Sequence, residues 1–150
     1  MKNENNFLKG FTLIELMVVI VIIIVLSTFV TANVMVYLAK GKNAAIKGNM
    51  ANLATYGGTY LTNYEEHEDY SNFCDDSKTQ EFLDVIDEIN GDGTGQCYSN
   101  EDNWCAKFDL ITTIRADKEK PVFCVDSMGV KKEGKKGTLS CSPTSGYRCP

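Results

Sequence analysis

The chain has 150 residues, which is enough for one small domain with an appended segment but not for several domains. Its formal net charge is -5 and it lacks a basic stripe, which argues against direct nucleic-acid binding because phosphate contacts need Lys and Arg. One local basic cluster consists of Lys131, Lys132, Lys135 and Lys136. In this acidic background we interpret it as a solvated hairpin tip rather than as a DNA- or surface-binding patch.

Residues 11–38 form one long apolar segment in which Glu15 is the sole charged residue. As a helix this segment would be about 42 Å long, which exceeds the ~30 Å hydrocarbon core of a bilayer. We therefore expect a membrane-spanning helix. Three kinds of segment are possible, and they differ in the N-terminus of the mature protein. A permanent membrane anchor keeps Met1, a secretory signal is cut after Ala32, and a third kind of segment is cut in front of Phe11. The apolar stretch is much longer than the ~7–15-residue core of a secretory signal.

The start of the segment reads Lys9-Gly10-Phe11-Thr12-Leu13-Ile14-Glu15. A short basic leader ends in Gly, Phe follows, and an apolar run carries Glu at its fifth place. This pattern resembles the processing site of type IV prepilins, and the resemblance is strong over residues 1 to about 64 and weak beyond. It implies a leader over residues 1–10, cleavage after Gly10 by a membrane aspartyl prepilin peptidase, and methylation of the new Phe11 amine.

Glu15 also points to this interpretation on physical grounds. A carboxylate near the middle of a bilayer costs ~2.5–3.5 kcal/mol even on permissive scales, so a span retains one only with a partner. Cleavage would create an ammonium group on Phe11, which lies on the same helix face as Glu15 because the two are four residues apart. Between chains, Glu15 of one subunit would pair with the Phe11 amine of its neighbour and set the axial register.

The resemblance implies further partners and a location. The helix over 11–38 would form the core of a helical homopolymer, assembled by a platform and a separate cytoplasmic ATPase. The precursor would be a single-pass protein of the cytoplasmic membrane, in contact with lipid, and the product an extracellular pilus. Lys40, Lys42 and Lys47 follow the span, so the positive-inside rule alone favours the opposite orientation.

Residues 39–64 predict an amphipathic continuation of this helix. Ile46, Met50, Leu53, Gly57, Tyr60 and Tyr64 recur at spacings of three and four, which indicates one buried stripe. The aromatic residues of this stretch are interpreted as core. Beyond it, residues 65–150 predict a globular head that begins with an acidic loop, in which His67 is expected to be exposed.

The head is expected to contain one helix and a hairpin. Ser77 and Gln80 resemble a capping box in front of a helical face, and Asn90-Gly91 would end that helix. Alternating patterns predict strands within 104–114 and 121–130, joined by the charged connector 115–120. Oxygen ligands for Ca²⁺ are available on Asp92, Glu101 and Asp102, but their spacing fits no EF-hand loop. We therefore predict neither a metal site nor a cofactor.

Six cysteines lie after the apolar segment: Cys74, Cys97, Cys105, Cys124, Cys141 and Cys149. An even count in a loop-rich region indicates disulfides and an oxidising compartment, and no C-x-x-C pair suggests zinc. Six cysteines allow 15 connectivities, among which we favour 74–97, 105–124 and 141–149. The last pair would close residues 137–150, here called the tail, which is rich in Ser, Gly and Pro.

These observations together predict an α+β protein: a long N-terminal helix packed against a small antiparallel sheet with disulfides, which is the pilin fold. The expected function is a structural pilus subunit for adhesion, motility or DNA uptake. A pseudopilin of a type II secretion or competence machine has the same N-terminus and stays open. A membrane-anchored or secreted binding module is the alternative of another class. An enzyme is not predicted, because the sequence shows no nucleophile–base constellation and no phosphate loop.

Overall fold

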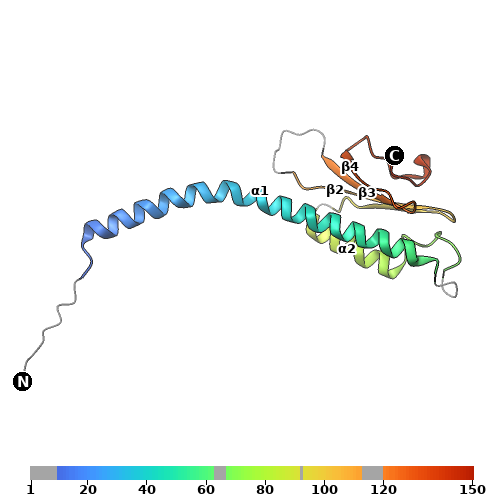
Figure 1. Cartoon of the computed structure of the whole chain (residues 1–150), viewed down its shortest axis with the longest axis horizontal. Coiled ribbons are helices and arrows are strands. Elements are labelled where there is room, and N and C mark those ends of the chain that lie inside the picture. Colours follow the sequence, from blue (N-terminus) through green and yellow to red (C-terminus); the bar gives the residue numbers. More distant parts are fainter. Residues whose placement is uncertain (1–9, 63–66, 92, 113–119) are drawn as a thin grey trace, which may run out of the picture. The chain divides into compact units, whose positions relative to one another are not determined.

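The computed structural model describes residues 10–62, 67–91, 93–112 and 120–150, apart from the side chains of residues 29–33. Some expectations fall outside these described residues: those for the leader residues 1–9, Tyr64, Asp92 and most of the connector 115–120. The chain divides into two units, Met1–Val36 and Tyr37–Pro150. Helix α1, Leu13–Tyr60, contributes to both (Figure 1).

The first unit is helical from Leu13 onward and exposes its apolar side chains. Within the described residues, no helix is both long enough and apolar enough to cross a bilayer, and the span expected over residues 11–38 stays a prediction.

The second unit is built on the C-terminal part of α1. The stripe expected on this part is confirmed, because Ile46, Met50, Leu53 and Gly57 are buried and Tyr60 is only 3% exposed. The stripe packs in one core with Phe73, Ile86 of α2 and the sheet residues Trp104, Ala106, Phe108 and Val125. The helix was expected to continue to Tyr64, but α1 ends at Tyr60 and a turn follows.

Helix α2 spans Ser77–Asn90, and its first-turn amides are capped by Asp76. The Asp76 carboxylate accepts hydrogen bonds from the backbone N–H groups of Lys78 (3.0 Å) and Thr79 (3.1 Å). The capping box expected at Ser77 is therefore wrong by one residue, since Asp accepts from the N2 and N3 amides as readily as Ser does. The expected end is confirmed: Gly91 adopts a left-handed conformation with φ 74°.

Within the part of the chain that the structure describes, four antiparallel strands form the sheet in the order β1-β2-β3-β4, which confirms the α+β class. Their bounds are Gln96–Ser99 for β1, Trp104–Asp109 for β2, Pro121–Asp126 for β3 and Lys131–Lys135 for β4. One face carries the core residues that pack on α1. The other face carries Cys105 and Cys124, which cluster with Leu139, Cys141 and Cys149 of the tail.

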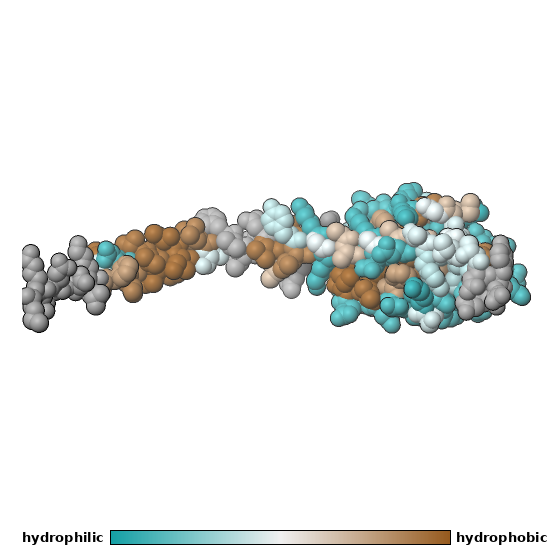
Figure 2. All heavy atoms as spheres, turned by 60° about the horizontal axis from the view of Figure 1, so that its bottom comes forward, coloured by the Kyte–Doolittle hydropathy of each residue, from teal (hydrophilic) through white to brown (hydrophobic). Residues whose placement is uncertain are grey.

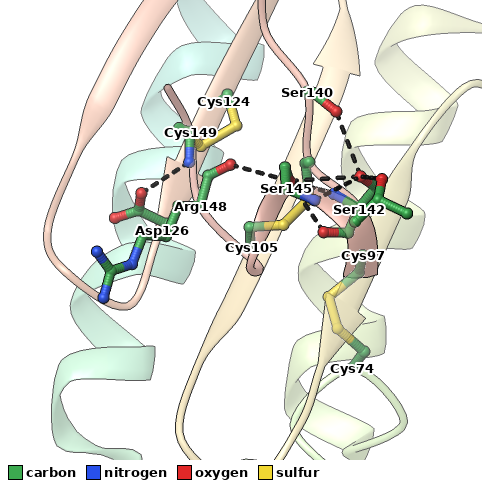
Figure 3. The surroundings of a disulfide bond; sticks show 12 residues. Cys74, Cys97, Cys105, Cys124, Asp126, Ser140, Ser142, Ser145, Arg148 and Cys149 are labelled. Atoms are coloured by element: carbon green, nitrogen blue, oxygen red, sulfur yellow. Dashed lines mark hydrogen bonds between the residues drawn. A yellow bond between two sulfur atoms is a disulfide. The ribbon is translucent and has the colours of Figure 1, made fainter.

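All six cysteines form disulfides, and the expected pair Cys74–Cys97 is confirmed. The other two expected pairs are wrong: Cys105 bonds to Cys141 and Cys124 to Cys149. The sheet register explains this, because Cys105 lies opposite Asp126 whereas Cys124 lies opposite Lys107. The two cysteines share a face but are offset by two residues, and such diagonal neighbours are about 7–8 Å apart, too far for a disulfide. Each is joined to the tail instead (Figure 3).

Candidate functional site

The predicted site residues Gly10, Phe11 and Glu15 surround the beginning of α1. Gly10 and Phe11 precede the helix and are exposed, with Phe11 at 87%. Among the described residues, no atom beyond Gly10 and its chain neighbours lies within 4 Å of the place where a Cβ on Gly10 would stand. The Gly10–Phe11 peptide bond is therefore open to an approaching group, and Glu15 lies in the first turn that follows.

Thr12 and Glu15 form a reciprocal capping box at this helix start. The Glu15 carboxylate accepts hydrogen bonds from the backbone N–H and the side-chain hydroxyl of Thr12, both at 2.8 Å. The Glu15 amide in turn donates to the Thr12 hydroxyl oxygen at 3.3 Å. Two amides that helix geometry leaves without an intrahelical acceptor are thereby satisfied. The sequence reasoning missed Thr12, although the T-x-x-E spacing that it forms with Glu15 is the known signal for such a box.

The structure shows one task of Glu15, which is to cap the start of α1. In the uncleaved chain the nitrogen of Phe11 is an amide without charge, and the structure shows Glu15 bonded to Thr12. The expected pairing of Glu15 with a charged Phe11 amine requires cleavage and stays a prediction. A glutamate carboxylate accepts through two oxygens, and the bonds to Thr12 use only Oε2.

Next to this site, α1 presents an apolar surface on the first unit. Every large apolar side chain from Leu13 to Leu26 is 46% exposed or more. The hydroxyls of Ser27 and Thr28 donate to the helix carbonyls of Ile23 (2.7 Å) and Val25 (2.8 Å). Figure 2 shows hydrophobic spheres along this stretch on the face in view. An exposed apolar surface of this extent marks contact with lipid or with another protein.

On the second unit, an open cleft of about 550 Å³ lies beside the end of α1. Its lining is acidic and consists of Tyr60, His67, Glu68, Asp69, Asn72, Asp75 and Asp76. His67 was expected to be exposed, but it is half-buried and stacks on Tyr60 with ring centroids 3.8 Å apart. Among the residues that the structure describes, no group of three or more His, Cys, Asp or Glu side chains is placed to hold a metal ion.

Burial raises the pKa of Tyr60, which lines this cleft, and of Tyr70, which stacks on it, above the ordinary value of 10.0. For Tyr60 the largest cause is desolvation, and the charges of Asp76 and Asp69 raise its pKa further. For Tyr70 desolvation acts alone, and its hydroxyl donates to the Gly57 carbonyl at 3.1 Å. Both rings pack against Phe73, so these phenols belong to the core more than to a binding site.

Asp126, at which the sequence indicates the beginning of a turn, fixes the tail on the sheet. It is 1% exposed, and its carboxylate accepts from the backbone N–H groups of Met128 (3.0 Å), Val130 (3.1 Å) and Cys149 (2.9 Å). Asp at the start of a turn is a known signal for such bonds to the backbone two residues on. The bond to Cys149 has no local signal. Figure 3 shows it beside the Cys124–Cys149 disulfide.

Comparison with known proteins gives one match, which covers the beginning of the chain. Residues 8–31 match the family model of the prokaryotic N-terminal methylation motif. Neither a curated protein nor a solved structure shows significant similarity to the chain. The matched residues include Gly10, the Thr12–Glu15 capping box and the apolar surface up to Leu26.

Proposed function

We propose that this chain, which carries the type IV prepilin signature, is a structural subunit of an extracellular type IV pilus. The proposal rests on the start of α1 and the peptide bond in front of it. An exposed Gly10–Phe11 bond stands directly before a capped helix whose apolar side chains, from Leu13 on, are open to a partner. Such a helix suits two environments in turn, namely lipid before assembly and the apolar helices of other subunits after it.

The first step is proteolytic. A single-pass precursor in the cytoplasmic membrane loses residues 1–10 when water adds across the Gly10–Phe11 peptide bond through the prepilin peptidase. The leader leaves with a carboxylate on Gly10, and Phe11 gains a free amine. In its neutral form this amine takes a methyl group from a sulfonium methyl donor, which leaves as a thioether while the amine loses one proton to water. The methylated amine then takes up a proton and is positively charged. The capping box does not involve the Phe11 nitrogen, so the helix start remains intact after the cut.

The second step is assembly on the platform and its ATPase. The new positive charge at Phe11 offers Glu15 of a neighbouring subunit a partner inside an apolar environment, where an unpaired carboxylate is costly. The apolar side chains of α1 supply contact area, and the charge pair fixes how far one subunit is displaced along its neighbour. In this proposal the apolar side chains supply the contact area and the charge pair sets the register, which explains why the segment retains one acid among aliphatic residues.

The proposal is tested at the mature N-terminus. Mass spectrometry of the protein sheared from cells should find a chain that begins with methylated Phe11. Gly10→Ala should leave the leader attached and abolish surface filaments. Gly41→Ala is the matched control, because its Cβ would also meet no atom within 4 Å and it lies outside the processing site. A mature chain that begins at Asn33 would indicate a secreted module, and one that begins at Met1 a permanent anchor.

A pseudopilin would give the same mature N-terminus, and electron microscopy separates the two. Long filaments in the sheared material support a pilus. Their absence from cells that contain processed Phe11 chains would favour the short pseudopilus of a secretion or competence machine.

A further inference from the structure

Helix α2 has an exposed face that carries three acidic residues. Glu81, Asp84 and Glu88 recur at spacings of three and four, and all three are exposed. Val85, which is 40% exposed, lies among them. Within the described residues none of the three carboxylates forms an ion pair. Like charges at these spacings destabilise an isolated helix, so an opposite charge supplied from outside the chain would stabilise this stripe.

The edge strand β4 carries the opposite charge. Lys131, Lys132 and Lys135 are exposed, and the one acid of the strand, Glu133, pairs with Lys47 of α1 at 2.6 Å. The Lys132 ammonium group donates to the carbonyl of Pro150 at 2.8 Å. Charged side chains on an edge strand prevent pairing with another strand. The edge is therefore suited to a contact through charge rather than through backbone hydrogen bonds.

The two charged surfaces belong to opposite edges of the second unit. Leu83 of α2 lines a cleft together with Cys97 of β1 and Phe108 of β2, which places the helix beside the β1 end of the sheet. Strand β4 is the other end of the strand order. In Figure 1, α2 and β4 lie on different sides of α1. One copy can therefore offer its acidic stripe to a neighbour while its own basic edge contacts another copy.

We propose that the α2 stripe of one copy docks on the β4 edge of the next copy in the filament. This contact rests on the proposed function. It joins two different surfaces, which is the type of interface that generates open helical assemblies when the rotation does not close a ring. The partner is a second copy rather than nucleic acid, because a net charge of -5 repels polyanions while the same chain supplies the matching acids.

Charge reversal in the full chain tests the contact. Lys131→Glu with Lys132→Glu, and separately Glu81→Lys with Glu88→Lys, should each lower the yield of sheared filaments by roughly tenfold. The four substitutions together restore opposite charges and should return the yield to near that of the parent. Glu101→Lys with Asp102→Lys is the matched control, because both are exposed acids in the loop between β1 and β2. This control should assemble normally.

Two further measurements keep the outcome decisive. Mature Phe11 and three disulfides in every variant, seen by mass spectrometry, show that processing and folding persist. Parent filaments should also fragment as salt rises, since screening weakens exposed charge contacts.

Reversed variants that assemble like the parent, or a control that fails equally, would overturn the contact but leave the pilus proposal intact. Normal assembly with lost adsorption to DNA would assign the edge to nucleic acid and overturn it too. A parent without processed Phe11 removes the proposed function itself.

Discussion

At the scale of single residues, one substitution can separate the capping role of Glu15 from the electrostatic role that we propose for it. Gln is also a good partner in a capping box, because its carbonyl accepts the same hydrogen bond from the Thr12 amide. Glu15→Gln should therefore keep the helix start and cleavage after Gly10, but it removes the negative charge that a neighbouring Phe11 amine would meet. We expect processed Phe11 chains in the membrane with at least about tenfold fewer filaments, since losing a buried charge partner is strongly unfavourable.

The measurement compares sheared filaments with membrane-bound chains by immunoblot. Glu15→Gln filaments at parental yield would show that the charge is dispensable, and the proposed register contact would then be wrong. Thr12→Ser serves as the control, because Ser caps a helix as well as Thr does.

Gly57 illustrates how one residue sets the distance between α1 and the sheet. A Cβ on Gly57 would stand 2.2 Å from Cζ2 of Trp104, a fully buried ring, whereas Gly58 has open space around it. Gly57→Ala should destabilise the second unit by about 1–3 kcal/mol through overpacking. Gly58→Ala should stabilise it by up to about 1 kcal/mol, because Ala is the better helix former.

Thermal unfolding of the two variants in detergent, followed by near-UV circular dichroism of Trp104, measures both effects. Equal shifts in the two variants would contradict the packing that the structure shows, since only Gly57 faces the indole ring.

At the scale of elements, the tail depends on covalent anchors rather than on regular structure. The one regular element of the tail is the short 3-10 helix η1, Pro143–Ser145. Two disulfides join the tail to β2 and β3. Replacing Cys124 and Cys149 by Ser should cost about 2–5 kcal/mol and release the chain beyond Cys141. Chymotrypsin should then cut at Tyr147, which is half-buried in the intact protein.

The matched control replaces Cys74 and Cys97 by Ser. This disulfide joins the segment before α2 to β1 and does not touch the tail. It should lower stability by a similar amount without exposing Tyr147. Cleavage at Tyr147 in both variants would mean that the tail is released by general loosening and not by loss of its own anchor.

The helices and strands also show which structural features can be predicted from local sequence. Periodicity predicted the buried stripe from Ile46 to Tyr60 and the strand pattern around Trp104, because side chains of one face recur at fixed intervals. The pairing of Cys105 and Cys124 could not be predicted, since it depends on a two-residue offset between β2 and β3. The bond from Cys149 to Asp126 is likewise a contact across 23 residues without a local signal.

The candidate site at the start of α1 could be predicted from the sequence more completely than the fold of the head. Gly10, Phe11 and Glu15 lie within six residues, so a short pattern contains the whole arrangement. Even there, the charge of Glu15 predicts a role in assembly but gives no indication of the bonds to Thr12, which satisfy free amides at the helix start. The rule for capping boxes would have identified Thr12.

At the scale of the whole molecule, the two units are stabilised by different means. Within the described residues, the unit up to Val36 is helical from Leu13 on, and the hydrogen bonds of this helix are internal to it, so its helical state does not depend on a packed core. The unit from Tyr37 has a small core, three disulfides and a cluster of aromatic rings. A change of solvent that acts on the core should therefore affect one unit and leave the other helical.

Alkaline pH is such a change. The folded unit raises the pKa of Tyr60 and Tyr70 above the ordinary value of 10.0, so it holds these protons more tightly than the unfolded chain does. Their contribution to stability is complete below pH 10 and is lost as the pH rises through the raised folded pKa values. In detergent, the second unit should melt at a lower temperature as the pH rises above 10, as followed by near-UV circular dichroism, while much of the far-UV helix signal of α1 persists. Tyr70→Phe removes one titrating phenol and should make this loss shallower, whereas an unchanged profile in that variant would show that Tyr70 does not drive the transition.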